Sequence, residues 1–187
     1  KTDHSILILI YFIFGIISVP LWVYLSKIYG KHRIWCYAMI LTSVAFLFVL
    51  GIQPGNILPF AIICAITGMG LGADMALPPS IQADVIDYDK LINKESRAGI
   101  CFALWGMSTK LALALSVGIA FPLLEYLGFS IKETNEPSAI RALVVIYAGF
   151  PVVLKLISIS LIWSFPINRG KVEIISRRLK KLNCLKL

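Results

Sequence analysis

Five long apolar runs, separated by short polar segments, dominate the chain. They cover residues 6–25, 34–52, 57–77, 99–124 and 142–165. The length of each run is close to what an α-helix needs to cross about 30 Å of hydrocarbon, which is about 20 residues. The pattern therefore predicts five transmembrane helices and an all-α membrane protein.

The composition indicates the same class. Apolar residues make up 58% of the 187 residues, and the mean hydropathy is +0.84, which is more apolar than a soluble domain with a polar surface. The four cysteines lie far apart, without metal or disulfide spacing, and we interpret them as small apolar side chains. The chain is predicted to be an integral membrane protein.

The net charge of +8 would also suit a nucleic-acid-binding protein, so the positions of the basic residues decide the matter. Thirteen of the 18 lysines and arginines follow the first, third and fifth runs, whereas only three lie on the opposite side. Basic residues concentrate on the cytoplasmic side of membrane proteins. We therefore predict that the 26–33 link, the 84–98 link and the C-terminus are cytoplasmic, and that nucleic acid is not a partner.

This orientation starts the chain on the outer side, with neither an initiator methionine nor a signal peptide. We interpret the chain as the C-terminal part of a longer polytopic protein. Residues 1–166 are predicted to form a transmembrane bundle and residues 167–187 a basic tail. In the tail, Val172, Ile175, Leu179 and Leu182 recur at helical spacing between basic residues. This pattern is typical of an amphipathic helix lying on anionic lipid.

The third run has an irregular composition. Gly68, Gly70 and Gly72 form a small-residue face on which another helix can approach closely. Pro78 and Pro79 are expected to disrupt helical hydrogen bonding near the cytoplasmic end of the run. Helix packing is the favoured explanation of the glycines, and irregular backbone beside a cavity is the alternative.

Two charged residues within the runs indicate a polar interior. Asp74 lies in the third run and Lys110 in the fourth, and a rise of about 1.5 Å per residue puts them at similar depths. A charge in hydrocarbon is costly unless it has a partner or lines a cavity. We therefore predict that Asp74 and Lys110 form an ion pair or face one aqueous cavity. The alternative for Asp74 is a water pocket at headgroup level.

The fourth and fifth runs carry further candidates. Small residues on two sides of the fourth run, including Ala112 and Ser116, predict an inner helix with two neighbours. Trp105 could stack on a sugar, although packing or a position at the membrane interface is the favoured explanation. Lys155 is deep enough to need a partner, with a structural and a functional role both open.

The sequence resembles the glycoside-pentoside-hexuronide:cation symporters. The residues that carry the resemblance are the run 70–89, which ends in Asp84-Val85-Ile86-Asp87-Tyr88-Asp89, the group Arg97-Ala98-Gly99, and the run 105–114 around Lys110. This family includes the melibiose permease and belongs to the major facilitator superfamily. The resemblance implies that the five runs are helices eight to twelve, in the C-terminal bundle of that superfamily.

Site residues follow from the resemblance. Lys110 matches the family's functionally important intramembrane lysine, and we add Asp74 and Trp105 as candidates for contact with the solute or coupling cation. The candidates for a cytoplasmic gate are Asp84, Asp87, Arg97, Lys31 and Arg33.

The resemblance also implies a function and partners. The expected activity is cation-coupled symport of a sugar, glycoside or related small solute by alternating access, in the bacterial inner membrane. No cofactor is expected besides the coupling cation, Na⁺ or H⁺. The main ligands of that cation belong to the family's N-terminal six-helix bundle, which is the expected partner of this chain.

Other functions fit the sequence less well. A lysolipid or amphiphile symporter of the same superfamily would also have the intramembrane lysine, and a non-transporting membrane remnant or subunit is a further alternative. An enzyme is not expected, because the sequence has no His-x-x-x-His cluster, Gly-x-Ser-x-Gly elbow or paired membrane aspartates.

Overall fold

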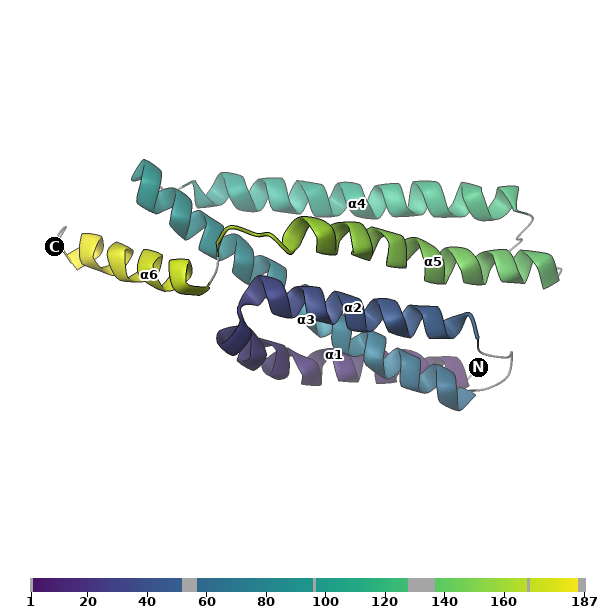
Figure 1. Cartoon of the computed structure of the whole chain (residues 1–187). Helices are drawn as coiled ribbons and strands as arrows, with labels where there is room; N and C mark the ends of the chain where they lie inside the picture. The colour runs from purple at the N-terminus through teal and green to yellow at the C-terminus, as the bar shows by residue number, and fades with distance from the viewer. Residues whose placement is uncertain (1, 52–56, 96, 128–136, 168, 185–187) are drawn as a thin grey trace.

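The computed structural model describes residues 2–51, 57–95, 97–127, 137–167 and 169–184. This part of the chain forms six α-helices and no strand (Figure 1). The helices are α1 (Thr2–Tyr29), α2 (Lys31–Val49), α3 (Ile57–Asn93), α4 (Ala98–Tyr126), α5 (Pro137–Ile162) and α6 (Arg169–Cys184). The all-α prediction is confirmed.

The first five helices are the predicted membrane helices. Each of α1 to α5 is long and apolar enough to cross a membrane. Large apolar side chains such as Ile16, Ile17 and Leu58 are exposed on their surfaces. An apolar surface of this extent is expected where the surrounding solvent is lipid rather than water.

The helices are arranged around α3. Both α1 and α2 pack against α3, α5 packs against α2, and α4 contacts α5 and the C-terminal part of α3 (Figure 1). The buried core consists of Trp22, Ile34, Ala38, Ala73 and Leu77. These residues come from α1, α2 and α3 alone, so these three helices form the best-packed part of the bundle.

Close packing between these helices depends on the glycines of α3. A methyl group at Gly68 would collide with the backbone carbonyl of Tyr11 on α1, and one at Gly70 would collide with Thr42 on α2. A methyl group at Gly72 would also collide with α1. The prediction that these glycines serve helix packing is confirmed.

A single residue, Gly30, links α1 to α2. Its φ of 95° lies in the left-handed region that favours glycine. The Gly30 N–H donates to the Ser26 carbonyl at 3.0 Å, and the Gly30 carbonyl accepts a hydrogen bond from the Ile34 N–H at 3.1 Å. The two helices can therefore turn back on each other with the basic residues of the link at the turn.

The third helix is longer than the sequence predicts. The expected break at Pro78 and Pro79 is wrong, since α3 runs through both prolines to Asn93. Asp84 and Asp87 consequently lie on a helix rather than in a loop. A proline removes one donor from a helix, but Leu77 is 1% exposed and Pro78 is also buried. Packing of this turn against neighbouring helices stabilises the helical conformation, although two prolines locally disfavour it.

The fourth helix is not the inner helix that its small residues predict. No residue of α4 is buried, and both Ala112 and Ser116 are exposed within the described chain. Within that part, α4 contacts only α5 and α3 appreciably. Small residues indicate that a close neighbour is tolerated, but they do not identify it.

The basic tail forms the predicted helix, α6. It packs against α3 with Ile175 buried at 5% exposure, and the Arg169 Nη1 donates to the Ile28 carbonyl at 3.0 Å. Part of its apolar face therefore contacts protein. The side chain of Leu182 lies outside the described residues, and the contact of α6 with lipid stays a prediction, as does the cytoplasmic orientation.

Trp22 should contribute a measurable hydrogen bond to the α1–α3 interface. Its Nε1 donates to the Met69 carbonyl at 2.7 Å, and the side chain is 6% exposed. We expect Trp22→Phe to lower the free energy of unfolding by about 1 kcal/mol, because one part-buried hydrogen bond to the Met69 carbonyl is lost while the Ser18 hydroxyl still donates to it. Thermal unfolding in detergent measures this. Trp163→Phe is the control, since Trp163 is 50% exposed, and an equal shift in both variants would contradict the expectation.

Candidate functional site

A polar cluster lies among the membrane helices around Asp74. The Asp74 carboxylate on α3 accepts a hydrogen bond from the Trp35 Nε1 on α2 at 2.7 Å. Its other oxygen lies 3.2 Å from the Lys155 Nζ on α5. Three helices thus meet at one carboxylate, and each of its oxygens has one donor.

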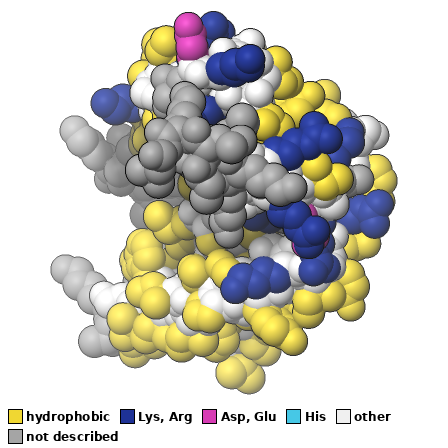
Figure 2. Space-filling view, turned by 90° about the vertical axis from the view of Figure 1, so that its left-hand side faces the viewer, with side chains coloured by type: hydrophobic (Ala, Val, Ile, Leu, Met, Phe, Trp, Pro, Cys, Tyr) yellow, Lys and Arg dark blue, Asp and Glu magenta, His cyan; other side chains and the backbone are white. Residues whose placement is uncertain are grey.

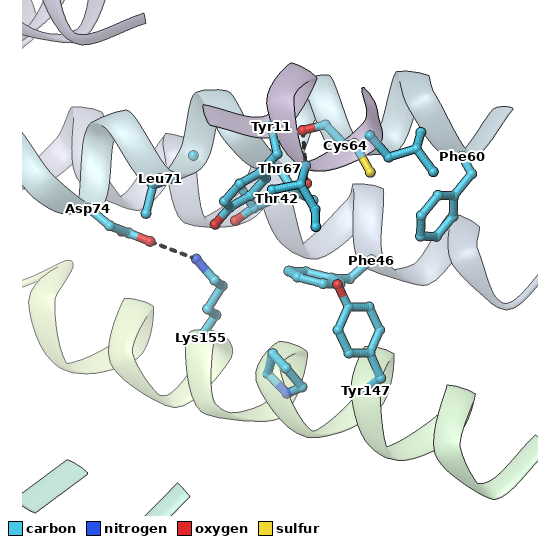
Figure 3. A pocket seen from close by; sticks show the side chains of 14 residues that line it. Tyr11, Thr42, Phe46, Phe60, Cys64, Thr67, Leu71, Asp74, Tyr147 and Lys155 are labelled. Carbon is cyan, nitrogen blue, oxygen red and sulfur yellow. Dashed lines mark hydrogen bonds and ion pairs between the residues drawn. The ribbon is translucent and has the colours of Figure 1, made fainter. Parts of the chain in front are cut away.

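The cluster forms one end of a cavity of about 490 Å³ (Figure 3). The cavity is lined by residues of α1, α2, α3 and α5. In Figure 3 the Asp74–Lys155 pair lies at one end and Phe60 at the other, with Phe46 and Tyr147 between them. Small-molecule sites in proteins have volumes of about 300–1,000 Å³, and this cavity falls within that range.

The lining of this cavity is mixed. Tyr11, Thr42, Thr67 and Tyr147 supply hydroxyl groups, whereas most other lining side chains are apolar. The Thr42 and Thr67 hydroxyls donate to backbone carbonyls of their own helices. The charged pair and the two tyrosines are therefore the polar groups with most freedom to bind a ligand.

Local features of the sequence position this cluster. Gly70, one turn before Asp74, allows α2 to approach α3 at Thr42, which places the carboxylate beside α2. Pro151, one turn before Lys155, lines the same cavity on α5. The packing of α5 against α2 then brings the ammonium to the carboxylate.

The ion pair balances the negative charge of Asp74, but it does not use all the N–H donors of Lys155. The Lys155 side chain is 20% exposed and that of Asp74 is 39% exposed. An ammonium has three N–H donors, and Asp74 is the one acceptor that it contacts among the described residues. The other donors remain available to water or to an oxygen-rich ligand in the cavity.

The predicted partner of Asp74 is wrong. Asp74 pairs with Lys155, whereas Lys110 is exposed on α4 and does not line the cavity. Trp105 also lies on α4 and is 40% exposed. The rise per residue gives the depth of a side chain but not the helix that faces it, and Lys155 is the lysine on the helix that packs beside Asp74.

The structure brings together two of the five gate candidates. The Lys31 Nζ lies 2.7 Å from the Asp84 carboxylate, with side-chain exposures of 30% and 14%, and it also donates to the Ser80 carbonyl at 3.2 Å. This contact connects the start of α2 to the C-terminal extension of α3, the part of the helix that follows Pro79.

The other three gate candidates are exposed. The Arg97 Nη2 lies 3.6 Å from the carboxylate of Glu95, two residues earlier in the sequence. Neither Arg33 nor Asp87 forms an ion pair with a described residue. The structure therefore does not join them to the Lys31–Asp84 contact.

Two members of the central cluster were absent from the predicted site. Lys155 had a usable signal, because a lysine deep within an apolar run needs a partner. Trp35 had none, since a tryptophan near a helix end is common at membrane interfaces. Across the described residues, no group of three or more His, Cys, Asp or Glu side chains could hold a metal ion.

Comparisons with known proteins agree with the resemblance seen in the sequence. A family model described as MFS/sugar transport protein matches residues 1–169. The chain is 28% identical over 158 residues to the sodium-dependent lysophosphatidylcholine symporter 1 of Gallus gallus, covering 83% of this chain and 30% of the relative. For the human protein of the same name, identity is 25% over 174 residues, with coverages of 91% and 32%.

A bacterial relative has a different named solute. The chain is 23% identical over 181 residues to the glucuronide carrier protein homolog of Escherichia coli (strain K12), covering 93% of this chain and 39% of the relative. The chain thus spans 30% to 39% of the length of these three relatives. The first two relatives are named as symporters and the third as a carrier homolog.

Proposed function

We propose, since this chain belongs to the MFS/sugar transport protein family, that it is part of a cation-coupled symporter that works by alternating access. The observation that carries this proposal is the Asp74–Lys155 pair at the wall of a cavity between four helices. Ionisable residues inside a membrane bundle are costly and usually mark a path for a solute or an ion. In transporters of this kind, such sites lie between helix repeats that rock against each other.

In this proposal the cavity contacts the solute. Lys155 donates to solute oxygens with the N–H groups that Asp74 does not use, and Asp74 keeps the ammonium oriented. The coupling cation is Na⁺ or H⁺. Its main ligands come from the N-terminal bundle that we propose as the partner of this chain, because the described residues contain no cluster of acidic ligands.

Lys110 and Trp105 have a separate role in this proposal. Both are exposed on α4, and the chain spans about a third of the length of its relatives. We assign the exposed surface of α4 around these two residues to the contact with the partner bundle across the transport path. An exposed lysine at this depth in lipid would otherwise lack a partner.

A sugar, glycoside or related small solute is the first candidate. The free ammonium donors and the hydroxyls of Tyr11 and Tyr147 suit a ligand rich in oxygen, and aromatic rings can stack on sugar faces. An amphiphile is the second candidate. It is supported by the apolar end of the cavity, which includes Phe46 and Phe60, and by the names of the lysophosphatidylcholine symporters.

Counterflow in vesicles tests this function. The full-length protein is reconstituted and preloaded with unlabelled solute, and entry of labelled glucuronides, other glycosides or lysophosphatidylcholine is followed with and without Na⁺ or H⁺ gradients. We expect one solute class to exchange and its accumulation to need one of the gradients. Absence of exchange for every solute, by protein shown to be folded, would contradict the transport proposal.

The Lys31–Asp84 contact should act as a cytoplasmic gate. Lys31→Asp or Asp84→Lys alone should change the exchange rate about fivefold, which corresponds to loss of about 1 kcal/mol of a partly buried ion pair. Solute affinity should change less, because the contact is far from the cavity around Asp74. The charge swap, Lys31→Asp with Asp84→Lys, should recover most of the rate.

Lys90→Asp is the control for charge reversal at this end of α3, because Lys90 is exposed there. Counterflow rates at saturating and limiting solute separate rate from affinity. A charge swap that behaves no better than the single variants would argue against the gate.

A further inference from the structure

A second cavity lies at the end of the bundle where α6 packs. It has a volume of about 600 Å³ and lies between the end of α1, the start of α2, the C-terminal extension of α3, the segment 165–167 and α6. By the charge distribution this end is the predicted cytoplasmic side. The cavity is separate from the one that contains Asp74, because the two share no lining residue.

Basic side chains dominate the lining of this cavity. The basic and imidazole groups are Lys27, Lys31, His32, Arg169 and Arg177. Its two carboxylates already have partners, since Asp84 pairs with Lys31 and Glu173 pairs with Arg177, each at 2.7 Å. Lys27 and Arg169 form no ion pair with a described residue. Within the described chain, their charges therefore have no acidic partner.

The surrounding surface has the same sign. Figure 2 views the molecule from this end, and lysine and arginine side chains gather on it while acidic side chains are few. The basic lining of the cavity thus belongs to an end of the molecule that is itself rich in basic side chains. Such a surface attracts anions from an acidic membrane leaflet.

One wall of the cavity is apolar. Ile81, Phe165, Ile167 and Val172 line it beside the basic groups. A soluble anion needs only the charged wall, whereas a lipid has a charged headgroup joined to apolar chains. The arrangement therefore suits an amphiphile held at the membrane surface better than a free ion.

We propose that this cavity binds the phosphate headgroup of an anionic glycerophospholipid from the cytoplasmic leaflet. Lys27 and Arg169 contact the phosphate, and the apolar wall contacts the glycerol and the first methylenes of the acyl chains. Because Lys27 belongs to α1 and Arg169 to α6, the lipid would join the two helices beside the Lys31–Asp84 contact. Lipid composition would then regulate how firmly α6 holds this end of the bundle. The proposal does not depend on the transport function.

Titration with short-chain lipids tests the proposal. The full-length protein, freed of native lipid in a neutral detergent, is titrated with dioctanoylphosphatidylglycerol below its micelle concentration, and with dioctanoylphosphatidylcholine as the neutral probe. We expect the anionic lipid to bind at least about tenfold more tightly. We expect Lys27→Gln and Arg169→Gln each to weaken that binding about fivefold, as one basic contact does near an anionic surface.

Arg178→Gln is the matched control. Arg178 lies on α6 next to Arg177 but lines a different cavity, with Tyr88 and Leu91, so its loss should change binding less than about twofold if the contact is local. Lys27→Gln keeps the test informative even if Arg169→Gln loosens α6, because the Lys27 side chain has no hydrogen bond to another described residue.

Three outcomes would overturn the proposal. The first is equal binding of the two lipids. The second is an equal loss in Lys27→Gln and Arg178→Gln, which would indicate general surface charge. The third is displacement of the lipid by inorganic phosphate or glycerol 3-phosphate at similar concentration, which would identify a site for soluble phosphate instead.

Discussion

A Gly68→Val protein should fail to accumulate in folded form. Any side-chain carbon at position 68 collides with the backbone carbonyl of Tyr11 on α1. Backbone cannot rotate away as a flexible side chain can, so α1 and α3 must separate along the interface that also buries Trp22 and Ala73. We expect a loss of about 3 kcal/mol or more, measured as monodisperse protein after extraction and as the midpoint of thermal unfolding.

Gly149→Val is the matched control for this expectation. It introduces the same side chain into a membrane helix, on α5, where no described atom lies within 4 Å. Gly68→Ala should fall between the two, because one methyl group requires a smaller shift of α1. Comparable yields and unfolding midpoints for Gly68→Val and Gly149→Val would mean that the α1–α3 interface is looser than the structure indicates.

The sequence predicted those features of the fold that depend on residues close together in the chain. The five membrane helices were predicted from the length and hydropathy of the apolar runs. The structure confirms five helices that are long and apolar enough to cross a membrane. The packing role of Gly68, Gly70 and Gly72 follows from side-chain size at helical spacing. In each case the cause lies within a few residues of the effect.

The central cluster depends on which helices become neighbours, and this information is not local. The estimated depth along the membrane suggested Lys110 as the partner of Asp74, but Lys110 and Lys155 both lie within apolar runs. The choice between them depends on α5, rather than α4, packing against α2, which brings Lys155 to Asp74 on α3. A single sequence contains no direct signal for that arrangement, and Trp35 was missed for the same reason.

The extension of α3 shows how tertiary packing overrides a local rule. Pro78 and Pro79 together remove two backbone donors, which predicts a break. The turn nevertheless stays helical because Leu77 and Pro78 are buried against neighbouring helices. The unbroken helix extends beyond the apolar run and presents Asp84 to Lys31. A broken helix would not fix that distance, so the proposed gate depends on the feature that the sequence did not predict.

Breaking the Asp74–Lys155 pair should damage both stability and transport. Among the described residues, Asp74→Asn leaves the ammonium without an anion, and Lys155→Met leaves the carboxylate with Trp35 as its one side-chain donor. Removing one partner of a fully buried pair costs about 3–5 kcal/mol, and the 20% and 39% exposures of these side chains reduce the expected loss to roughly 2 kcal/mol. Uptake should fall at least about tenfold in each variant, the change that ~1.4 kcal/mol of lost binding produces.

The double variant, Asp74→Asn with Lys155→Met, separates structure from function. Without either charge the cavity has no unpaired ion, so the unfolding midpoint should return close to that of the unchanged protein. Uptake should stay at the level of the single variants, because the donors that would bind the solute are gone. Lys90→Met serves as the control for loss of an exposed lysine and should change neither quantity. If the double variant regained uptake together with stability, the pair would serve only to hold α3 and α5 together, and the cavity would lose its role in solute binding.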